Sequence, residues 1–298
     1  MSNQKILLSF LSITMATMLV QCTKSTSPEI PNYYCNQPPP GITPELYAPE
    51  IFASTGGQLH GFPAIAPAGN EIHWPVLPPK ILYVTFTNGE WSQPETASCS
   101  TGNIQAPVYS ADGKKLFFQL SDPAGFGSLD ICYIEQTDTG WSAKKNLGQP
   151  PNTAQLESQP SFTHSGTVYY TGYYQHGLWG RGIYRSVFRA GKYEKPQLLP
   201  ATINTKYLDY TPFIAADESF LLFSSSRPTM DESALRLYVS FRDSAGNWST
   251  PHNLNDLMEF DQPSRFPCLT PDNKFIIFLS GNKYYWVSSK ILELCRPE

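Results

Sequence analysis

The chain has 298 residues, of which 21 are Lys or Arg and 25 are Asp or Glu, so its formal net charge is −4. It contains no run of Lys and Arg, which argues against nucleic acid as a partner. Charged residues make up only 15% of the chain and aromatic residues make up 13%, beside 27 prolines and 20 glycines. Many aromatic residues together with many turn formers favour an all-β domain.

Residues 1–21 have the composition of an export signal. Lys5 is followed by an apolar run from Ile6 to Val20, which is too short and too early to predict a spanning helix. The run ends in LVQC at residues 19–22, which resembles a bacterial lipobox and implies that Cys22 is acylated as the mature N-terminus. An uncleaved signal anchor and a secretory peptide cut a few residues later are the alternatives. All three place the rest of the chain outside the cytoplasm.

Residues 22–45 are expected to form a flexible tether that precedes a folded domain of residues 46–298. Thr23 and Lys24 follow the cysteine, and the lack of an aspartate there favours the outer membrane over the inner membrane. Residues 23–32 are polar, and Pro38–Gly41 is stiff and cannot pair in a central strand. A disordered N-terminus without a function is the alternative to a tether.

From there, five segments share one layout, in which an X-Pro step opens a short strand, a turn follows, and an apolar, aromatic strand comes next. The five prolines lie 44 to 55 residues apart, at Pro63, Pro107, Pro160, Pro212 and Pro267. In the clearest copy, Asp112-Gly113 is a hairpin signal between two hydrophobic runs. The second strands are expected at Ile72–Trp74, Leu116–Phe118, Val168–Tyr170, Phe220–Phe223 and Phe275–Phe278.

A third strand is expected around one tyrosine in every copy, namely Tyr83, Tyr133, Tyr184, Tyr238 and Tyr285. In four copies a turn and an aromatic residue follow, and an outer fourth strand then completes the unit. Four antiparallel strands repeated about every 50 residues are typical of β-propeller blades. The sequence therefore predicts an all-β fold, a single β-propeller of five four-stranded blades.

The fifth copy lacks a fourth strand of its own. Ala48–Ala53 looks like the outer-strand segments at residues 93–97 and 195–199. We therefore expect this N-terminal segment to complete the fifth blade, which ties the two chain ends together and removes an open edge. Residues 290–298 are the alternative last strand.

Two segments identify a family resemblance. SADGKKLFF at residues 110–118 and GWS at residues 140–142 look like the PD40, or WD40-like, repeat of TolB-like periplasmic proteins and many envelope lipoproteins. The link from Leu147 to Pro160 also fits and recurs from Leu199 to Pro212, so that the resemblance covers roughly residues 47–290. It implies the propeller fold and favours a role in protein contacts, while fold likeness alone assigns no activity.

The cysteines other than Cys22 are an odd set for an oxidising compartment: Cys35, Cys99, Cys132, Cys268 and Cys295. A Cys35–Cys295 disulfide that staples the ring shut is the pairing expected first, because these two residues flank the predicted closing strand and blade five. Cys132 and Cys268 lie in strand-like runs and are expected to be buried free thiols. No C-x-x-C pair or histidine cluster is present, so neither a metal nor another cofactor is expected.

The polar residues just before the X-Pro steps occupy comparable places, where the inner strands begin at one mouth of the channel. They are candidates for a small-ligand or peptide site: His60, Gln105, Glu157, Asp209 and Arg265. Solvated side chains or loop caps are the alternative. The loop Gly172–Gly182 carries Tyr173, Tyr174, His176 and Trp179, which are either contact anchors or a cluster that folds back locally.

These features predict a lipid-anchored binding or scaffolding module whose partner is an envelope protein or glycan. A purely structural envelope component is a further possibility, and a saccharide hydrolase with Glu157 and Asp209 as an acid–base pair is the main alternative. Both carboxylates recur in the linker of the repeat, which favours a structural role. No G-x-S-x-G, H-E-x-x-H or phosphate-loop spacing is present, so we expect no enzymatic activity.

Overall fold

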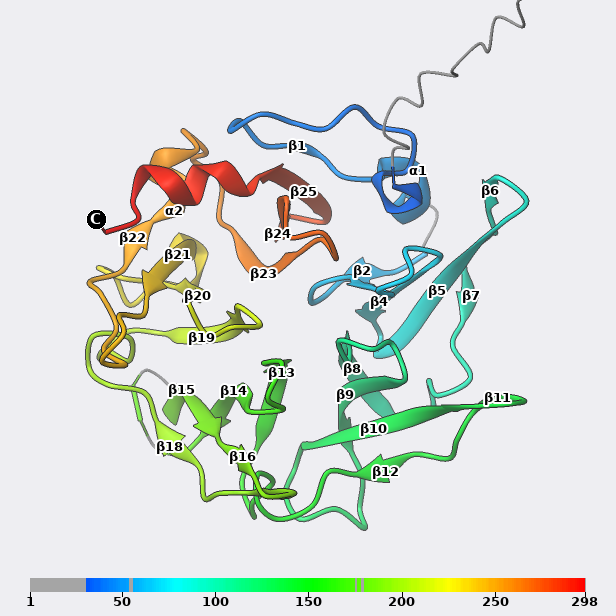
Figure 1. Cartoon of the computed structure of the whole chain (residues 1–298), viewed down its shortest axis with the longest axis horizontal. Helices are drawn as coiled ribbons and strands as arrows, with labels where there is room; N and C mark the ends of the chain where they lie inside the picture. Colours follow the sequence, from blue (N-terminus) through cyan, green and yellow to red (C-terminus); the bar gives the residue numbers. More distant parts are fainter. Residues whose placement is uncertain (1–30, 54–55, 175, 178–179, 298) are drawn as a thin grey trace, which may run out of the picture. The chain divides into compact units, whose positions relative to one another are not determined.

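Figure 1 shows the computed structural model, which describes residues 31–53, 56–174, 176–177 and 180–297. The described residues form five small antiparallel sheets around one axis, so the predicted five-bladed β-propeller is confirmed. The predicted signal peptide and Cys22 lie outside the described residues. None of the helices in the described part of the chain is long and apolar enough to cross a membrane.

Each sheet is one blade, and its strands follow one another outwards from the axis. Blade 1 contains β2 (Gln58–Leu59), β3 (Ala64–Ile65), β4 (Glu71–Leu77), β5 (Lys80–Thr87), β6 (Glu90–Trp91) and β7 (Glu95–Thr96). Blade 2 contains β8 (Asn103–Tyr109), β9 (Lys115–Ser121), β10 (Asp130–Thr137), β11 (Gly140–Trp141) and β12 (Lys145–Asn146). Blade 3 contains β13 (Glu157–Phe162), β14 (Val168–Tyr173), β15 (Arg181–Ser186) and β18 (Gln197–Leu198).

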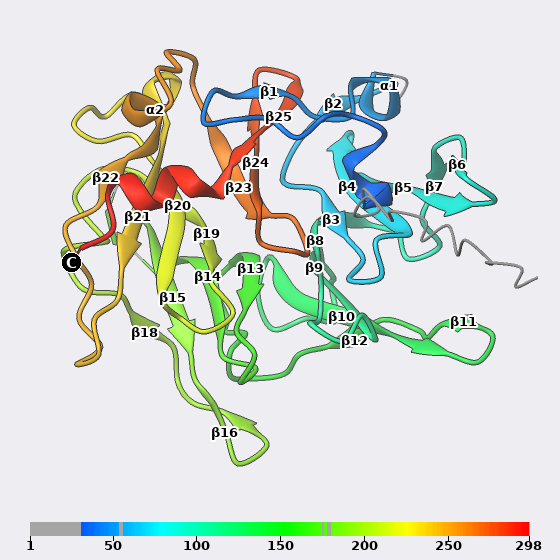
Figure 2. The same ribbon diagram turned by 45° about the horizontal axis from the view of Figure 1, so that its top comes forward.

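Blade 4 contains β19 (Asp209–Ile214), β20 (Phe220–Ser225), β21 (Arg236–Phe241) and β22 (His252–Asn253), and α2 (Leu254–Leu257) follows it. Blade 5 contains β23 (Arg265–Leu269), β24 (Phe275–Ser280), β25 (Lys283–Ser288) and the N-terminal β1 (Glu45–Leu46). A separate hairpin of β16 (Phe188–Arg189) and β17 (Lys192–Tyr193) extends from blade 3, and β11 forms a similar arm on blade 2 (Figure 2). The predicted second and third strands thus all exist.

A cross-strand aromatic pair repeats in every blade. The tyrosine of the third strand lies opposite a ring of the second strand in the pairs Tyr83–His73, Tyr133–Phe117, Tyr184–Tyr170, Tyr238–Phe223 and Tyr285–Phe278. The ring centroids of these pairs are 5.3 to 6.3 Å apart. Such pairs stabilise a sheet beyond the burial of their area. Blade 1 differs because a histidine takes the place of a phenylalanine or tyrosine.

The X-Pro steps form β-bulges on the inner strands. The residue before the proline has a left-handed φ of 49° to 57° at Ala106, Gln159, Thr211 and Phe266, and the register of β8, β13, β19 and β23 shifts there. At three bulges the amide donates to a side chain of the preceding blade: Gln159 to Gln119 (3.1 Å), Thr211 to Thr171 (2.9 Å) and Phe266 to Ser224 (3.3 Å). The bulges therefore connect neighbouring blades through polar contacts.

The N-terminal segment closes the ring, as the sequence predicts, but with other residues than expected. The blue β1 pairs antiparallel with β25, Glu45 opposite Trp286 and Leu46 opposite Tyr285 (Figure 1). The predicted strand Ala48–Ala53 is wrong, because Ala48 turns the chain at a φ of 42° and Pro49 begins the short helix α1 (Pro49–Phe52). The alternative segment also forms no strand: Ser289–Leu294 is a 3-10 helix with Ile291 and Leu292 buried.

Residues 31–45, which the sequence assigns to the expected tether, belong to the compact unit that begins at Pro31. Asn32–Tyr34 forms a 3-10 turn whose two tyrosines are buried. The hydroxyl of Tyr34 donates to Asp272 at 2.7 Å, and its ring packs edge-on against Phe275 and Trp286. Aromatic packing on blade 5 therefore holds residues that were expected to be flexible.

The expected Cys35–Cys295 disulfide is absent, because all five described cysteines are free thiols. Cys35 packs on the cluster around Tyr47, whereas Cys295 packs on a different cluster between blades 4 and 5. Cys132 and Cys268 are buried and free, as predicted. Burial raises the pKa of the Cys132 thiol to about 12, which is consistent with a small apolar role.

Candidate functional site

One mouth of the propeller combines the starts of the inner strands with the longer loops. Because the strands are antiparallel, the start of each inner strand lies beside the end of the second strand, as in the pairs Asn103–Ser121, Glu157–Gly172, Asp209–Ser225 and Arg265–Leu279. The loops between second and third strands are long in blades 2, 3 and 4, at residues 122–129, 174–180 and 226–235, and only two residues long in blades 1 and 5. We call this end the loop-bearing mouth, and all five predicted mouth residues lie at it.

Glu157 is fully buried, and its carboxylate holds the linker before its own strand. It accepts hydrogen bonds from the amide of Thr153 (3.0 Å), from the hydroxyl of Thr153 (2.6 Å) and from the hydroxyl of Tyr174. Burial raises the pKa of Glu157, and the hydrogen bonds from Thr153 and Tyr174 counteract part of that rise.

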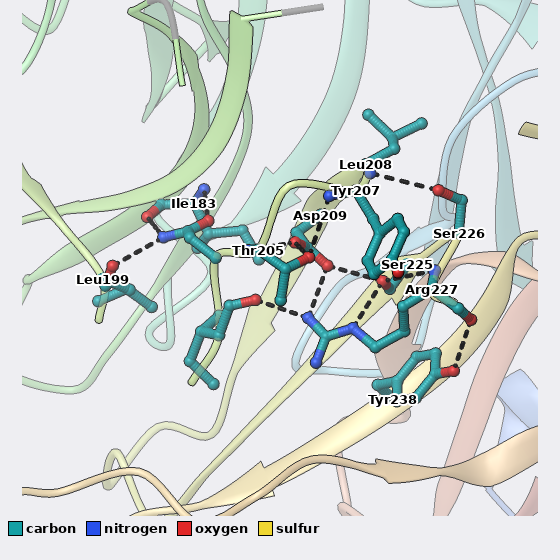
Figure 3. Close-up of polar contacts among 12 residues, drawn as sticks. Ile183, Leu199, Thr205, Tyr207, Leu208, Asp209, Ser225, Ser226, Arg227 and Tyr238 are labelled. Carbon is teal, nitrogen blue, oxygen red and sulfur yellow. Dashed lines mark hydrogen bonds and ion pairs between the residues drawn. The ribbon is translucent and has the colours of Figure 1, made fainter. Parts of the chain in front are cut away.

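Asp209 repeats this arrangement one blade further on (Figure 3). It accepts from the amide (2.7 Å) and the hydroxyl (2.6 Å) of Thr205, from Ser225 (2.6 Å), and from the Arg227 guanidinium (2.6 Å). The neighbouring Asn204 bonds both backbone groups of Ile183, just as Asn152 does with Ile131 in blade 2. The Asn-Thr-acid pattern of the linker therefore anchors the linker to the blade.

His60 and Arg265 lie close together at the mouth, and both contact the ring of Phe266. The ring of His60 is 5.3 Å from that of Phe266, and the Arg265 guanidinium carbon is 5.4 Å from the same ring centroid. Burial, with Arg265 and Arg181 nearby, lowers the pKa of His60 to about 4. His60 is therefore neutral at pH 7.

Two further mouth residues, Arg181 and Tyr210, are missed by the sequence reasoning. The guanidinium carbon of Arg181 is 4.7 Å from the ring centroid of Tyr173 and 5.6 Å from that of Tyr210. Tyr210 is 4% exposed, its ring is 6.3 Å from that of Phe266, and its hydroxyl has no hydrogen-bond partner among the described residues. No local signal marks either residue, because the two lie in different blades and Tyr210 has the pattern of an ordinary core position.

The other predicted site residues, Gln105 and those of the loop Gly172–Gly182, do not form one group in the structure. The side chain of Gln105 accepts a hydrogen bond from Gln119, its cross-strand partner in blade 2, at 3.2 Å. Tyr173 joins the mouth residues, whereas Tyr174 folds back against Tyr184, with ring centroids 4.4 Å apart. His176 is half-buried, and Trp179 lies outside the described residues. The structure thus brings together His60 and Arg265, and it ties Glu157 and Asp209 to the linkers.

Solved structures share this fold at low sequence identity. An endo-arabinase from Bacteroides thetaiotaomicron has a TM-score of 0.56 at 16% identity, over 79% of this chain and 94% of that chain. A thermostable family-43 glycoside hydrolase has a TM-score of 0.53 at 12% identity, over 78% and 89% of the two chains. A protein assigned as TolB from Agrobacterium tumefaciens has a TM-score of 0.51 at 15% identity, over 76% and 71%.

No family model and no curated protein matches the sequence. At these identities the similar structures show the fold alone, a β-propeller shared with TolB and with glycoside hydrolases.

Proposed function

We propose that this chain is an exported, lipid-anchored β-propeller that binds or scaffolds an envelope protein or glycan and does not hydrolyse a saccharide. One observation carries the proposal: the two carboxylates on which a hydrolase reading depends are committed to holding the linkers. Glu157 and Asp209 are 0% and 1% exposed, and each accepts two hydrogen bonds from the threonine four residues before it.

Glycoside hydrolysis needs a pair of carboxyl groups that both reach the scissile bond, one of them as a proton donor. A carboxylate that is already saturated by hydrogen bonds and by an arginine has little capacity left for this role. The hydrogen bonds from Thr153 to Glu157 and from Thr205 to Asp209 suit a structural role, because each set holds the linker where the chain enters the next blade. The endo-arabinase and family-43 similarities leave the chemistry open, since they concern the fold.

The test is an assay of the purified full-length protein against arabinan and a panel of other polysaccharides. We expect no release of reducing ends above the blank. Turnover that falls by roughly 100-fold or more in Glu157→Gln, with the variant still folded by circular dichroism, would contradict the proposal and assign a general acid–base role.

The location is tested separately through Cys22. We expect the mature protein to carry an acyl mass at this residue and to fractionate with the outer membrane, and Cys22→Ser to release it from the membrane fraction. A wild-type protein that is soluble in the periplasm, with no added mass, would contradict the anchor and leave the binding role to be judged on its own test.

A further inference from the structure

Five residues from four blades meet at the loop-bearing mouth, and we call them the mouth cluster. Blades 1 and 5 are neighbours in the ring, and the cluster runs from blade 1 through blades 5 and 4 to blade 3, with the members His60, Arg265, Phe266, Tyr210 and Arg181. Phe266 contacts three of the other members, within 5.3 to 6.3 Å between ring centroids or between ring and guanidinium. The cluster is therefore one continuous set of contacts and not a collection of separate surface residues.

The arginines in and near the cluster differ in whether a carboxylate neutralises them. Arg227, which lies nearby in blade 4, is neutralised by Asp209 at 2.6 Å. Arg181 is 4.0 Å from Glu232, which is a long and partly exposed contact. Arg265 forms no ion pair with any residue of the described part of the chain. The cluster therefore presents positive charge with no matching carboxylate at Arg265.

A buried polar atom lies beside this charge. The hydroxyl of Tyr210 is in a side chain that is 4% exposed, and no described residue gives it a hydrogen bond. Arg265 is close enough to affect the pKa of Tyr210. Buried polar groups in folded proteins nearly always have a partner, and an unsatisfied one costs about 1–3 kcal/mol. A hydroxyl proton without an acceptor, beside a guanidinium without a carboxylate among the described residues, indicates that a ligand supplies the negatively charged acceptor that both groups lack.

We propose that the mouth cluster binds the carboxylate of a small acidic ligand. The Arg265 fork suits the two oxygens of a planar carboxylate, and Tyr210 donates a further hydrogen bond to one of them. A single unpaired guanidinium and a neutral hydroxyl match one negative charge better than the two of a phosphate. The ring of Phe266 offers an apolar contact to the rest of the ligand, and the neutral imidazole of His60 offers a hydrogen-bonding group.

This inference rests on the proposed binding function and specifies its ligand chemistry. Carboxylates of this kind occur in acidic sugars and at the ends of peptide chains, so the probes separate these sources. D-glucuronate is compared with D-glucose, and N-acetylglycine is compared with its amide, by calorimetric titration of the full-length protein. Inorganic phosphate is titrated in parallel. We expect at least one carboxylate probe to bind roughly ten-fold more tightly than its neutral counterpart.

Two variants test the assigned residues. Arg265→Gln is expected to weaken carboxylate binding by roughly ten-fold or more, since a charge-assisted pair is lost. Tyr210→Phe removes only one hydroxyl and is expected to weaken it by about five-fold. Arg242→Gln is the matched control, because this arginine pairs with Glu218 at 2.8 Å and takes no part in the cluster. It should leave binding unchanged.

The source of the carboxylate follows from which probe binds, and either source supports the inference. It is overturned when neither carboxylate probe binds, when the neutral counterparts or phosphate bind equally well, or when every variant that folds, Tyr210→Phe included, binds as the wild type does. Because Tyr210→Phe removes no charge and little volume, it decides the matter even where Arg265→Gln fails to fold. Polysaccharide turnover would contradict the proposed function without changing these titrations, so the two failures are distinguishable.

Discussion

At the scale of single residues, Asp209 and Arg227 form the most buried ion pair among the described residues. The side chains are 1% and 15% exposed, and Arg227 also donates to the carbonyl of Ile203 and to Ser225 (Figure 3). A buried pair of this kind adds little over an apolar pair of the same shape, but removing one partner leaves an uncompensated charge in the interior. The Asp209–Arg227 pair therefore matters for stability mainly through the free energy that is lost when one partner is removed.

We expect Arg227→Met to lower the free energy of unfolding by about 3–5 kcal/mol, because Asp209 then remains buried without its counter-charge. The measurement is urea unfolding at pH 7. Lys145→Met is the control, since Lys145 pairs with Glu135 on the exposed surface, where solvent screening leaves such a pair with little effect on stability. Equal small losses in both variants would show that the Asp209 contact is not a structural requirement.

His73 is the one histidine among the five cross-strand ring pairs, and this has a consequence for acid stability. Burial lowers its pKa from 6.5 to about 3, with Glu71 and Tyr109 as the polar groups that face it. The unfolded chain binds a proton near pH 6.5 and the folded chain does so only near pH 3. The contribution of His73 to stability is therefore fully present above pH 6.5 and is lost as the pH falls from there towards 3.

We expect His73→Phe, which copies the residue type of blades 2, 4 and 5, to remove this dependence. Linkage predicts a relative gain on the order of 2 kcal/mol at pH 5 compared with pH 7.5, while Glu71 titrates in both proteins. Urea unfolding of the two proteins at both pH values measures the difference. A gap between them that is the same at pH 5 and pH 7.5 would contradict the assignment of the proton to His73.

At the scale of elements, the polar contacts between blades depend on hydroxyls of the second strands. Thr171 and Thr211 are both fully buried, and the amide of Thr211 has the hydroxyl of Thr171 as its acceptor. Thr171→Val keeps the shape and leaves that amide unsatisfied, so we expect a loss of about 1–3 kcal/mol. Chemical unfolding measures it, with Thr96→Val on the exposed β7 as the control. A loss no larger than that of the control would show that the bulge contact is dispensable.

The elements also show how far the sequence predicts this fold. The X-Pro steps and the central tyrosines locate the inner, second and third strands, although in blades 2 to 5 the inner strands begin two to four residues before the proline and do not open at it. The closing strand is misplaced by a few residues, because Ala48-Pro49 resembles an outer strand in composition while the left-handed φ of Ala48 begins a helix there instead. The polar bulges were not predicted, since an X-Pro step looks the same with or without a partner on the next blade.

The candidate site was predicted in part. His60 and Arg265 were placed by their position before the X-Pro step, which the structure brings to one mouth. Arg181 and Tyr210 could not be found in this way, because their proximity arises from the packing of three blades and not from any spacing in the chain. The Cys35–Cys295 disulfide was predicted wrongly for the same reason, because three-dimensional packing decides the contacts. Both cysteines flank blade 5 in the sequence, but their side chains pack on two different hydrophobic clusters.

At the scale of the whole molecule, the N-terminal segment determines whether blade 5 has an open edge. Three tyrosines of this segment are buried in one hydrophobic cluster with Phe275 and Trp286 of blade 5, namely Tyr33, Tyr34 and Tyr47. In addition, β1 covers the edge of β25. A chain beginning at residue 48 should therefore unfold at lower urea concentration than one beginning at residue 31, since each fully buried side chain contributes about 1.5–3 kcal/mol. It should also aggregate through the bare strand. Indistinguishable unfolding of the two chains would contradict a closing role for this segment.

The pairing of β1 with β25 also has a consequence for the order in which the ring assembles. Glu45 precedes its partner Trp286 by 241 residues, so β1 is synthesised long before the strand with which it pairs. β1 therefore cannot pair until β25 has been made, and we expect docking of the N-terminal segment to come late in the assembly of the ring. Since Trp286 is packed by Tyr34 and Tyr47, its fluorescence should change when this segment docks during refolding.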